Sequence, residues 1–461
     1  MNRARLRCIN CAAEFPSHEV LYRCSVCGDL LDVVYDWPQM DPERLKSLWK
    51  ERLTTLLPHD ISGVWRFREM LPFFTDESQI VTYPEGNTPL LDAPHCARYT
   101  GLGRLQLKNQ GNNPTGSFKD NGMCTGVTQA RVLGMDAVLC ASTGNTSASM
   151  AAYAARAGML GVVLIPDGQI AYGKLSQSLD YGALTLQIAG DFDMAQSLVR
   201  EVASEARVYV LNSINPYRLE GQKTIILELL QQRGWQVPDR IVVPGGNLGN
   251  SSSFGKALKE LFDLGFINRM PKITIVQAHG ANPLYRTITG ADSSTLTTVH
   301  AKTLATAIKI GQPVSWRKAK RAMDWTNGWV TEVDEQAIAD AKAMIGRDGI
   351  GCEPASATTV AGIKKLVQTG TDEEVTAGED VVAILTGNML KDTEYTIRYH
   401  LGELYEDFVT ESTVTHKSGP LTSTYANRPL RIAAEKDAII AAIERFRAES
   451  QGRLPVSSAT R

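Results

Sequence analysis

The feature that most restricts the fold is an alternation of short apolar runs with helix-length segments between residues 137 and 277. Such an alternation is typical of βαβ units and parallel sheets. It appears in two sets, one before and one after about Gly234. The pattern predicts an α/β protein with two open parallel-sheet domains and a cleft between them. The expected strands are Val138–Cys140, Gly161–Ile165, Ala183–Ile188, Val208–Leu211, Arg240–Val243 and Ile273–Gln277.

Charge and hydrophobicity restrict the possible partners. Among 461 residues there are 48 Lys and Arg and 50 Asp and Glu, so the formal charge is −2. A protein that binds nucleic acid or a membrane surface normally has a basic field. No apolar run approaches the about 20 residues needed to span a bilayer, and the basic N-terminus leads into no apolar segment of a secretory signal. We therefore expect a cytoplasmic protein with no nucleic-acid partner and no membrane partner.

Four cysteines near the start form two Cys-x2-Cys pairs, Cys8 with Cys11 and Cys24 with Cys27. Two such pairs on a short hairpin can place four thiolates around one structural Zn²⁺. Disulfides and a knuckle without metal are the alternatives, and a cytosolic chain disfavours disulfides. The spacing favours a zinc-ribbon-like extension.

The segment from Val242 to Asn250, Val-Val-Pro-Gly-Gly-Asn-Leu-Gly-Asn, joins an expected strand to an expected helix. Glycines there let backbone N–H groups approach an anion, and the helix dipole favours its charge. The spacing differs from that of dinucleotide and Walker loops. A phosphate monoester therefore fits better than a nucleotide, with an ordinary turn as the alternative.

Lys119 follows a turn-rich stretch, Gly111-Asn-Asn-Pro-Thr-Gly-Ser-Phe, at the start of an expected helix. A surface lysine is the ordinary interpretation. A helix N-terminus and the apolar Phe118 would lower the pKa of the amine, as a Schiff-base lysine requires. A third turn, Ala141–Ser147, offers hydroxyls and backbone donors suited to a carboxylate. A phosphate cradle, an amine and a carboxylate cradle together describe a pyridoxal-phosphate enzyme that acts on an amino acid.

Four motifs in order resemble the fold-type II pyridoxal-phosphate enzymes and, within them, the threonine synthases. They are Asn-Pro-Thr-Gly-Ser-Phe-Lys-Asp at 113–120, Ser-Thr-Gly-Asn-Thr-Ser at 142–147, Asn-Ser-Ile-Asn-Pro-Tyr-Arg-Leu-Glu-Gly-Gln-Lys at 212–223 and Pro-Gly-Gly-Asn-Leu-Gly-Asn at 244–250. The likeness covers about residues 83–400, and the C-terminal helix after Asn427-Arg-Pro-Leu is similar to the plant-type branch. It implies a tryptophan synthase β-like fold and a homodimer.

The resemblance also implies residue roles. Lys119 would form the Schiff base with pyridoxal phosphate and move protons. The other cofactor-binding residues would be Asn145, Gly245, Gly246, Asn247, Leu248, Gly249 and Thr386. Ser142, Thr143 and Thr146 would bind the substrate carboxylate, and Asn212, Ser213, Arg218 and Asn250 would bind the substrate phosphate.

The implied reaction converts O-phospho-L-homoserine and water to L-threonine and phosphate, by γ-elimination and then β-addition of water. A related enzyme such as a cysteate synthase, acting on O-phosphoserine and sulfite, is the nearest alternative, and a non-catalytic ligand-binding homologue is another. One departure from the family pattern is Thr386-Gly-Asn-Met-Leu-Lys391, where the family has His-Gly in place of Asn388-Met389.

The sequence is divided by these patterns into six parts. We expect zinc-ribbon-like knuckles at 1–36, a wrapping segment at 37–82, a large cofactor-binding domain at 83–118 and 235–425, a small α/β domain at 119–234, a C-terminal helix at 426–448 and a disordered tail at 449–461.

Overall fold

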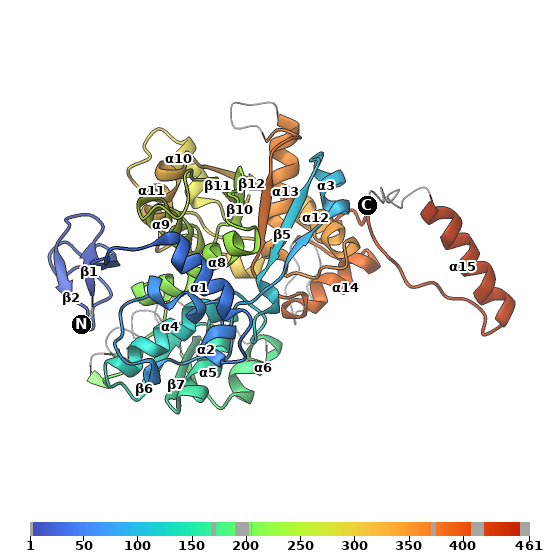
Figure 1. Ribbon diagram of the computed structural model, residues 1–461. Helices are drawn as coiled ribbons and strands as arrows, with labels where there is room; N and C mark the ends of the chain where they lie inside the picture. The colour runs from blue at the N-terminus through green and yellow to red at the C-terminus, as the bar shows by residue number, and fades with distance from the viewer. Residues whose placement is uncertain are drawn as a thin grey trace.

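The computed structural model describes residues 3–166, 172–189, 202–203, 205–369, 375–406 and 419–451. Three sheets organise this part of the chain (Figure 1). The predicted α/β architecture with parallel sheets is confirmed. Most of the predicted tail lies outside the described residues, and the domain boundaries stay a prediction.

The largest sheet has six strands in the order β12-β11-β10-β13-β5-β4, parallel except for β4 against β5. Alternate side chains of one strand reach opposite faces. In β10, Ile241 and Val243 pack on the face covered by α8 and α9, whereas Val242 packs on the face covered by α12 and α13. The strands of this six-stranded sheet are β4 Leu90–Asp92, β5 Leu105–Asn109, β10 Arg240–Pro244, β11 Lys272–Ala278, β12 Trp329–Val333 and β13 Val381–Leu385.

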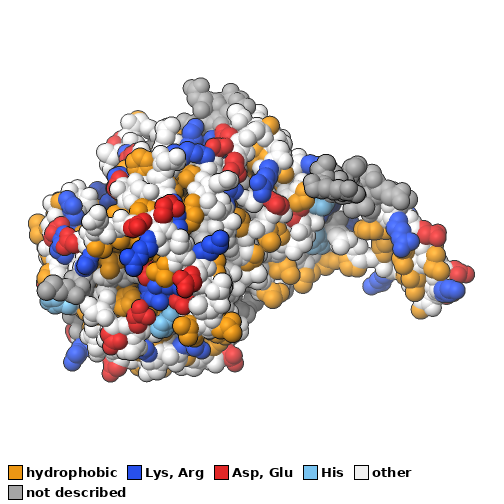
Figure 2. Space-filling view, in the orientation of Figure 1, with side chains coloured by type: hydrophobic (Ala, Val, Ile, Leu, Met, Phe, Trp, Pro, Cys, Tyr) orange, Lys and Arg blue, Asp and Glu red, His pale blue; other side chains and the backbone are white. Residues whose placement is uncertain are grey.

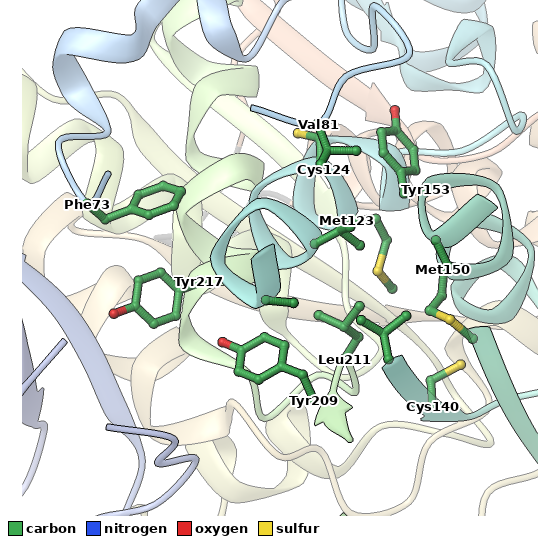
Figure 3. Packing of buried hydrophobic residues seen from close by; sticks show 14 of the residues in the cluster. Phe73, Val81, Met123, Cys124, Cys140, Met150, Tyr153, Tyr209, Leu211 and Tyr217 are labelled. Carbon is green, nitrogen blue, oxygen red and sulfur yellow. The ribbon is translucent and has the colours of Figure 1, made fainter. Parts of the chain in front are cut away.

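The second sheet has four parallel strands in the order β8-β7-β6-β9. They are β6 Ala137–Ala141, β7 Leu160–Pro166, β8 Leu184–Ile188 and β9 Tyr209–Val210, close to the predicted bounds. Figure 3 shows one buried face of this sheet, where Cys140, Tyr209 and Leu211 meet Met123 and Met150.

The described helices cover both faces of the large sheet, and several of them pack on a face of the small one. Helices in the N-terminal half are α1 Pro42–Arg52, α2 Pro58–Ile61, α3 Pro94–Thr100, α4 Lys119–Val132, α5 Asn145–Ala157 and α6 Tyr172–Asp180. The later helices are α8 Pro216–Gln232, α9 Gly249–Asp263, α10 Pro283–Thr289, α11 Trp316–Thr326, α12 Glu335–Arg347, α13 Pro354–Thr369, α14 Thr393–Leu401 and α15 Lys436–Gln451. None of these described helices is long and apolar enough to cross a membrane.

Helices α4 and α8 pack unusually closely because glycines lie at their contact. A Cβ on Gly221 of α8 would lie 1.7 Å from the carbonyl oxygen of Asn121 in α4. A Cβ on Gly122 of α4 would lie 2.8 Å from the carbonyl oxygen of Arg218 in α8. Neither position has room for a side chain.

The third sheet is antiparallel, in the order β2-β1-β3, and contains the four N-terminal cysteines in or beside its strands. The strands are β1 Ala4–Cys8, β2 Glu14–Pro16 and β3 Leu31–Tyr35. Leu6 and Val33 are fully buried beneath it. Gly28, directly after the second cysteine pair, has a φ of +77°, in the left-handed region that favours glycine.

The glycine contact predicts a large effect of one methyl group. Gly221→Ala should lower the free energy of unfolding by about 3 kcal/mol, because the added carbon overlaps a backbone oxygen that cannot move aside. Urea unfolding followed by circular dichroism measures this change. Gly346→Ala in α12 is the matched control, since nothing lies within 4 Å of its Cβ position. It should be neutral or stabilise by up to about 1 kcal/mol, and equal losses in both variants would contradict the prediction.

Candidate active site

A cavity of about 1260 Å³ opens at the carboxyl ends of strands from both parallel sheets. Ligands of open α/β proteins bind at this edge of a sheet. The predicted site residues that line it are Lys119, Ser142, Thr143, Asn145, Thr146, Asn212, Ser213, Arg218, Gly246, Asn247, Leu248, Gly249, Asn250 and Thr386. Gly245 directly precedes Gly246 but does not line the cavity. Its N–H donates to the carbonyl of Val276 at 2.7 Å.

Lys119 is the first residue of α4, and its amine lies 4.2 Å from the centre of the Phe118 ring. Burial, with a smaller contribution from the positive charge of Arg218, lowers the pKa of Lys119 to about 7, against the opposing effect of Glu353. The sequence predicted this direction from the helix terminus and Phe118, whereas the main cause is burial. A neutral amine, which is the nucleophilic form, is therefore abundant near pH 7.

The glycine loop between β10 and α9 brings a helix N-terminus to the cavity. Leu248 adopts a left-handed conformation with φ 65° directly before α9 begins at Gly249. A Cβ on Gly246 would lie 3.2 Å from Ile308, so only glycine fits there without displacement. The loop is further fixed by Asn247, whose side-chain oxygen accepts from the N–H of Val314 at 3.2 Å. A 15-residue helix that begins at such a loop favours a phosphate group.

Ser142–Thr146 form the turn between β6 and α5, which starts at Asn145 without a side-chain cap. Within the turn, the N–H of Gly144 donates to the Ser142 hydroxyl at 3.2 Å. The first N–H groups of an uncapped helix are available to a ligand, and the hydroxyls of Thr143 and Thr146 stand beside them in the cavity wall. The turn suits a carboxylate.

Glu353 is a site residue that the sequence reasoning missed. Its side chain is buried in the cavity wall, where Asn145 Nδ2 and the Thr386 hydroxyl each donate to its carboxylate at 2.9 Å. Burial raises the pKa of Glu353 above its ordinary value. Thr386 also exchanges a hydrogen bond with Ser356 at 2.9 Å. The only signal for Glu353 in the sequence is its position directly before Pro354, which begins a helix in an apolar stretch.

Arg218 is a buried cation with no carboxylate partner among the described residues. It is 1% exposed, and burial lowers its pKa to about 10. One guanidinium nitrogen donates to the Leu211 carbonyl at 2.9 Å, and its Nε has no partner. Asn250, which is also buried, has neither side-chain atom paired. Buried polar groups without partners are rare and point to a ligand.

Two other residues complete the description of this end of the cavity. Asn212 lines the cavity, but its amide also forms two 3.1 Å hydrogen bonds with the backbone of Ala141. Gln222, one turn after Arg218, is buried and lines the cavity with its Oε1 unpaired. Gln222 was not predicted, although its spacing of four residues from Arg218 places it on the same helix face.

The departure at Asn388-Met389 has a structural explanation. Asn388 Nδ2 donates to the Gly111 carbonyl at 3.2 Å, and its Oδ1 accepts from the N–H of Leu390 at 3.0 Å. Met389 is 45% exposed and packs against Gly351. Asn388 therefore fixes the loop, and Lys391, which follows it, lines the cavity and pairs with Gln177 of α6.

The four N-terminal cysteines lie together, far along the chain from the other site residues. Their Sγ atoms are all within 4.8 Å of one another. Cys8 and Cys27 are 3.4 Å apart and Cys11 and Cys24 are 3.6 Å apart, all as free thiols.

The pKa of Lys119 predicts a pH dependence that can be measured without cofactor. In the apoprotein, the rate at which Lys119 is acylated should rise with a midpoint near pH 7, the pKa given by its surroundings. Ordinary lysines in the same digest should react with a midpoint near about 10. Peptide mass spectrometry after labelling from pH 5.5 to about 10.5 measures both.

Two variants test the cause of the shift. Arg218→Gln removes a charge that lowers the pKa of Lys119, so the midpoint should move up. Glu353→Gln removes the carboxylate that raises the pKa, so the midpoint should move down. Shifts of the opposite sign, or a wild-type midpoint near 10, would contradict the assigned cause.

Comparison with known proteins agrees with this geometry. The family model described as "Pyridoxal-phosphate dependent enzyme" matches residues 81–387. A threonine synthase of Methanocaldococcus jannaschii is 44% identical over 393 residues, which are 85% of this chain and 94% of that protein. A threonine synthase of Methanosarcina acetivorans is 45% identical over 395 residues, covering 85% and 93% of the two chains.

Among solved structures, the Escherichia coli threonine synthase has the same fold with a TM-score of 0.64 and 17% identity, over 96% of this chain and 100% of that one. The family match spans the glycine loop, the Lys119 turn and Thr386. The chain belongs to the pyridoxal-phosphate dependent enzymes and, within them, to the threonine synthase family.

Proposed function

We propose that this protein converts O-phospho-L-homoserine and water into L-threonine and phosphate. The observation that carries the proposal is the buried guanidinium of Arg218, which has no carboxylate partner among the described residues, keeps its Nε unpaired and lines the same cavity as Lys119. A substrate with a phosphate group supplies the anion that this cation lacks. The curated relatives at 44% and 45% identity are named threonine synthases.

The residues around Lys119 fit pyridoxal phosphate. The glycine loop before α9 offers a cradle for its phosphate, with a Cβ position at Gly246 that a side chain would overfill. Asn145 and Thr386, joined by Glu353, would hold the polar edge of its ring. The bound cofactor, joined to the Lys119 amine, supplies an electron sink for carbanions next to the amino group.

Lys119 is suited to move protons at the substrate carbons. An amine with a pKa of about 7 gives and accepts protons readily near neutral pH. Protons must leave Cα and Cβ for loss of the phosphate group, and protons must return to Cγ and Cα when water adds at Cβ. The single amine at the start of α4 serves both halves of the reaction.

Arg218 and its neighbours would hold the leaving group. As the C–O bond to phosphate breaks, negative charge grows on the phosphate oxygens, and a buried guanidinium stabilises that charge strongly. Ser213 and Asn250 add polar side chains at the same end of the cavity, near Asn212. Ser142, Thr143 and Thr146, with the first N–H groups of α5, would orient the substrate carboxylate.

Activity assays with three variants test this function. Wild type should release phosphate from O-phospho-L-homoserine and form threonine. Lys119→Ala should lose more than about a thousandfold in rate, because the covalent and proton-transfer roles both disappear. Arg218→Gln should lose about ten- to a hundredfold in kcat/KM, as expected for a hydrogen bond to a charged group. Arg98→Gln, exposed on α3, is the control and should behave as wild type.

Product analysis distinguishes the alternatives. Cysteate from O-phosphoserine and sulfite, with no threonine from O-phospho-L-homoserine, would replace the proposed reaction by that of a related phosphoamino-acid enzyme. A protein that binds both substrates without turnover would be a ligand-binding homologue.

We also propose that Cys8, Cys11, Cys24 and Cys27 bind one structural Zn²⁺. Tetrahedral coordination with Zn–S bonds of about 2.3 Å places sulfurs about 3.8 Å apart. The Sγ separations of Cys8 from Cys27 and of Cys11 from Cys24, 3.4 and 3.6 Å, lie close to this spacing. Four protein ligands leave no open position, so the metal would stabilise the N-terminal sheet and take no part in the reaction.

Metal analysis tests the zinc proposal. Purified wild-type protein should contain about one zinc per chain by plasma mass spectrometry. Replacing Cys8 and Cys27 by serine should remove it and lower the thermal midpoint. Cys96→Ala, which alters a buried thiol of α3, should keep the metal. Equal zinc content in all three proteins would exclude this site.

We further propose that the protein is a cytoplasmic homodimer. Helix α15 lies away from the body of the molecule and exposes a row of hydrophobic side chains (Figure 2). Ile439, Ile440, Ile443 and Phe446 are 47, 41, 47 and 58% exposed. Contiguous exposed apolar surface is typical of protein interfaces, and sedimentation velocity measures the mass directly.

A further inference from the structure

The N-terminal sheet contacts both parallel-sheet regions behind the active-site cavity. On the side of the large sheet, Asp32 pairs with Lys318 at 2.8 Å and with Arg321 at 2.5 Å. Lys318 also donates to the carbonyl of Leu31 at 2.7 Å. These partners belong to α11, so the sheet is anchored firmly on this side.

On the side of the small sheet, two tyrosine hydroxyls make the contact. The Tyr22 hydroxyl accepts from the N–H of Val210 at 2.7 Å. The Tyr217 hydroxyl donates to the carbonyl of Ser17 at 3.0 Å, beside Gln129, which donates to the same carbonyl at 3.1 Å. Figure 3 shows the ring of Tyr217 beside Phe73 with its hydroxyl pointing toward the N-terminal segment.

The hydrogen bond from the Val210 N–H to the Tyr22 hydroxyl satisfies a backbone donor at the edge of the four-stranded sheet. Among the described residues, strand β9 is an edge strand, because β6 is its one neighbour there. The outward N–H of an edge strand has no strand partner, and a buried N–H without a partner is costly. Val210 is 2% exposed, so the Tyr22 hydroxyl takes the place of a missing strand.

Both tyrosine contacts lead directly to Arg218. Leu211, the residue after Val210, provides the carbonyl that accepts from the Arg218 guanidinium at 2.9 Å. Tyr217 is the residue before Arg218 in the first turn of α8. Asn215 joins the two routes, since its amide donates to the Val210 carbonyl at 2.8 Å and accepts from the Tyr217 N–H at 2.9 Å.

We infer that the N-terminal sheet positions the phosphate-binding guanidinium, and that Tyr22 and Tyr217 are the positioning residues through which it acts. The inference rests on the proposed phosphate site at Arg218. Tyr22 fixes the carbonyl that holds the guanidinium, and Tyr217 fixes the helix turn that carries it. The cysteine-bearing extension is thereby part of the substrate-binding machinery.

Steady-state kinetics of the holoenzyme test this inference. Tyr22→Phe and Tyr217→Phe each delete one hydroxyl and leave Arg218 in place. Each should raise KM for O-phospho-L-homoserine about three- to tenfold, the effect of one lost hydrogen bond. The inhibition constant of inorganic phosphate should rise by the same factor. We expect kcat to fall by a smaller factor than KM rises, because Arg218 also stabilises charge on the leaving phosphate while the Lys119 amine is untouched.

Tyr399→Phe is the matched control. Its hydroxyl is also buried and donates to Asp340 at 2.7 Å, but it belongs to α14, away from the phosphate site. This variant should lose thermal stability without a change in KM. The inference would be overturned if Tyr22→Phe and Tyr217→Phe lowered the thermal midpoint but left KM and phosphate inhibition unchanged, as expected for Tyr399→Phe. The two tyrosines would then have a purely structural role.

A binding measurement separates this inference from the proposed function. Equilibrium dialysis of the holoenzyme against inorganic phosphate needs no turnover. If wild type forms no threonine but binds phosphate, and the tyrosine variants bind it three- to tenfold more weakly, the inference stands while the proposed reaction fails. Unchanged phosphate binding in a tyrosine variant that folds would refute the inference. If Tyr22→Phe proves insoluble, Tyr217→Phe alone provides this test.

Discussion

The glycine contact between α4 and α8 determines the relative position of the two groups on which the site depends. Lys119 begins α4 and Arg218 lies in the first turn of α8. With no side chain at Gly122 or Gly221, the backbones approach until carbonyl oxygens touch the opposite helix. Interiors are packed too densely to absorb an extra carbon. The separation of amine and guanidinium is thus determined by backbone contact, which is far stiffer than contact between side chains.

The charges of the cavity are unbalanced in a way that suits its ligands. Arg218 is close enough to raise the cost of charging Lys119, and Glu353 is the carboxylate that acts in the opposite direction. Cofactor and substrate together bring two phosphates and a carboxylate. Their negative charge would compensate that of Arg218 and raise the pKa of Lys119 above its value in the apoprotein. The pKa of the apoprotein amine therefore reflects a site built for anions.

Local patterns predicted three parts of the site, and the resemblance to the family supplied its other residues. The glycine loop and the Ala141–Ser147 turn each follow a strand that is recognisable from its apolar run, and Lys119 follows a turn-rich stretch at a helix start. Glu353 was missed because it meets Asn145 and Thr386 only in the folded chain, over sequence separations of 208 and 33 residues, and such contacts are not encoded locally. The roles of all the predicted site residues stay predictions. For Gly245 and Asn212, the position agrees with structural as well as functional use.

The partners of the N-terminal sheet give the protein a particular order of folding. Its first strand leaves the ribosome early, yet Val210 follows Tyr22 by 188 residues and Lys318 follows Leu31 by 287. At about 5–20 residues per second, synthesis of the longer stretch of 287 residues takes roughly 15 to 60 seconds. A short antiparallel sheet alone is only marginally stable, whereas a metal-bound knuckle folds without distant partners. Metal binding by the cysteines would then let the nascent extension fold before the helices that it contacts have been synthesised.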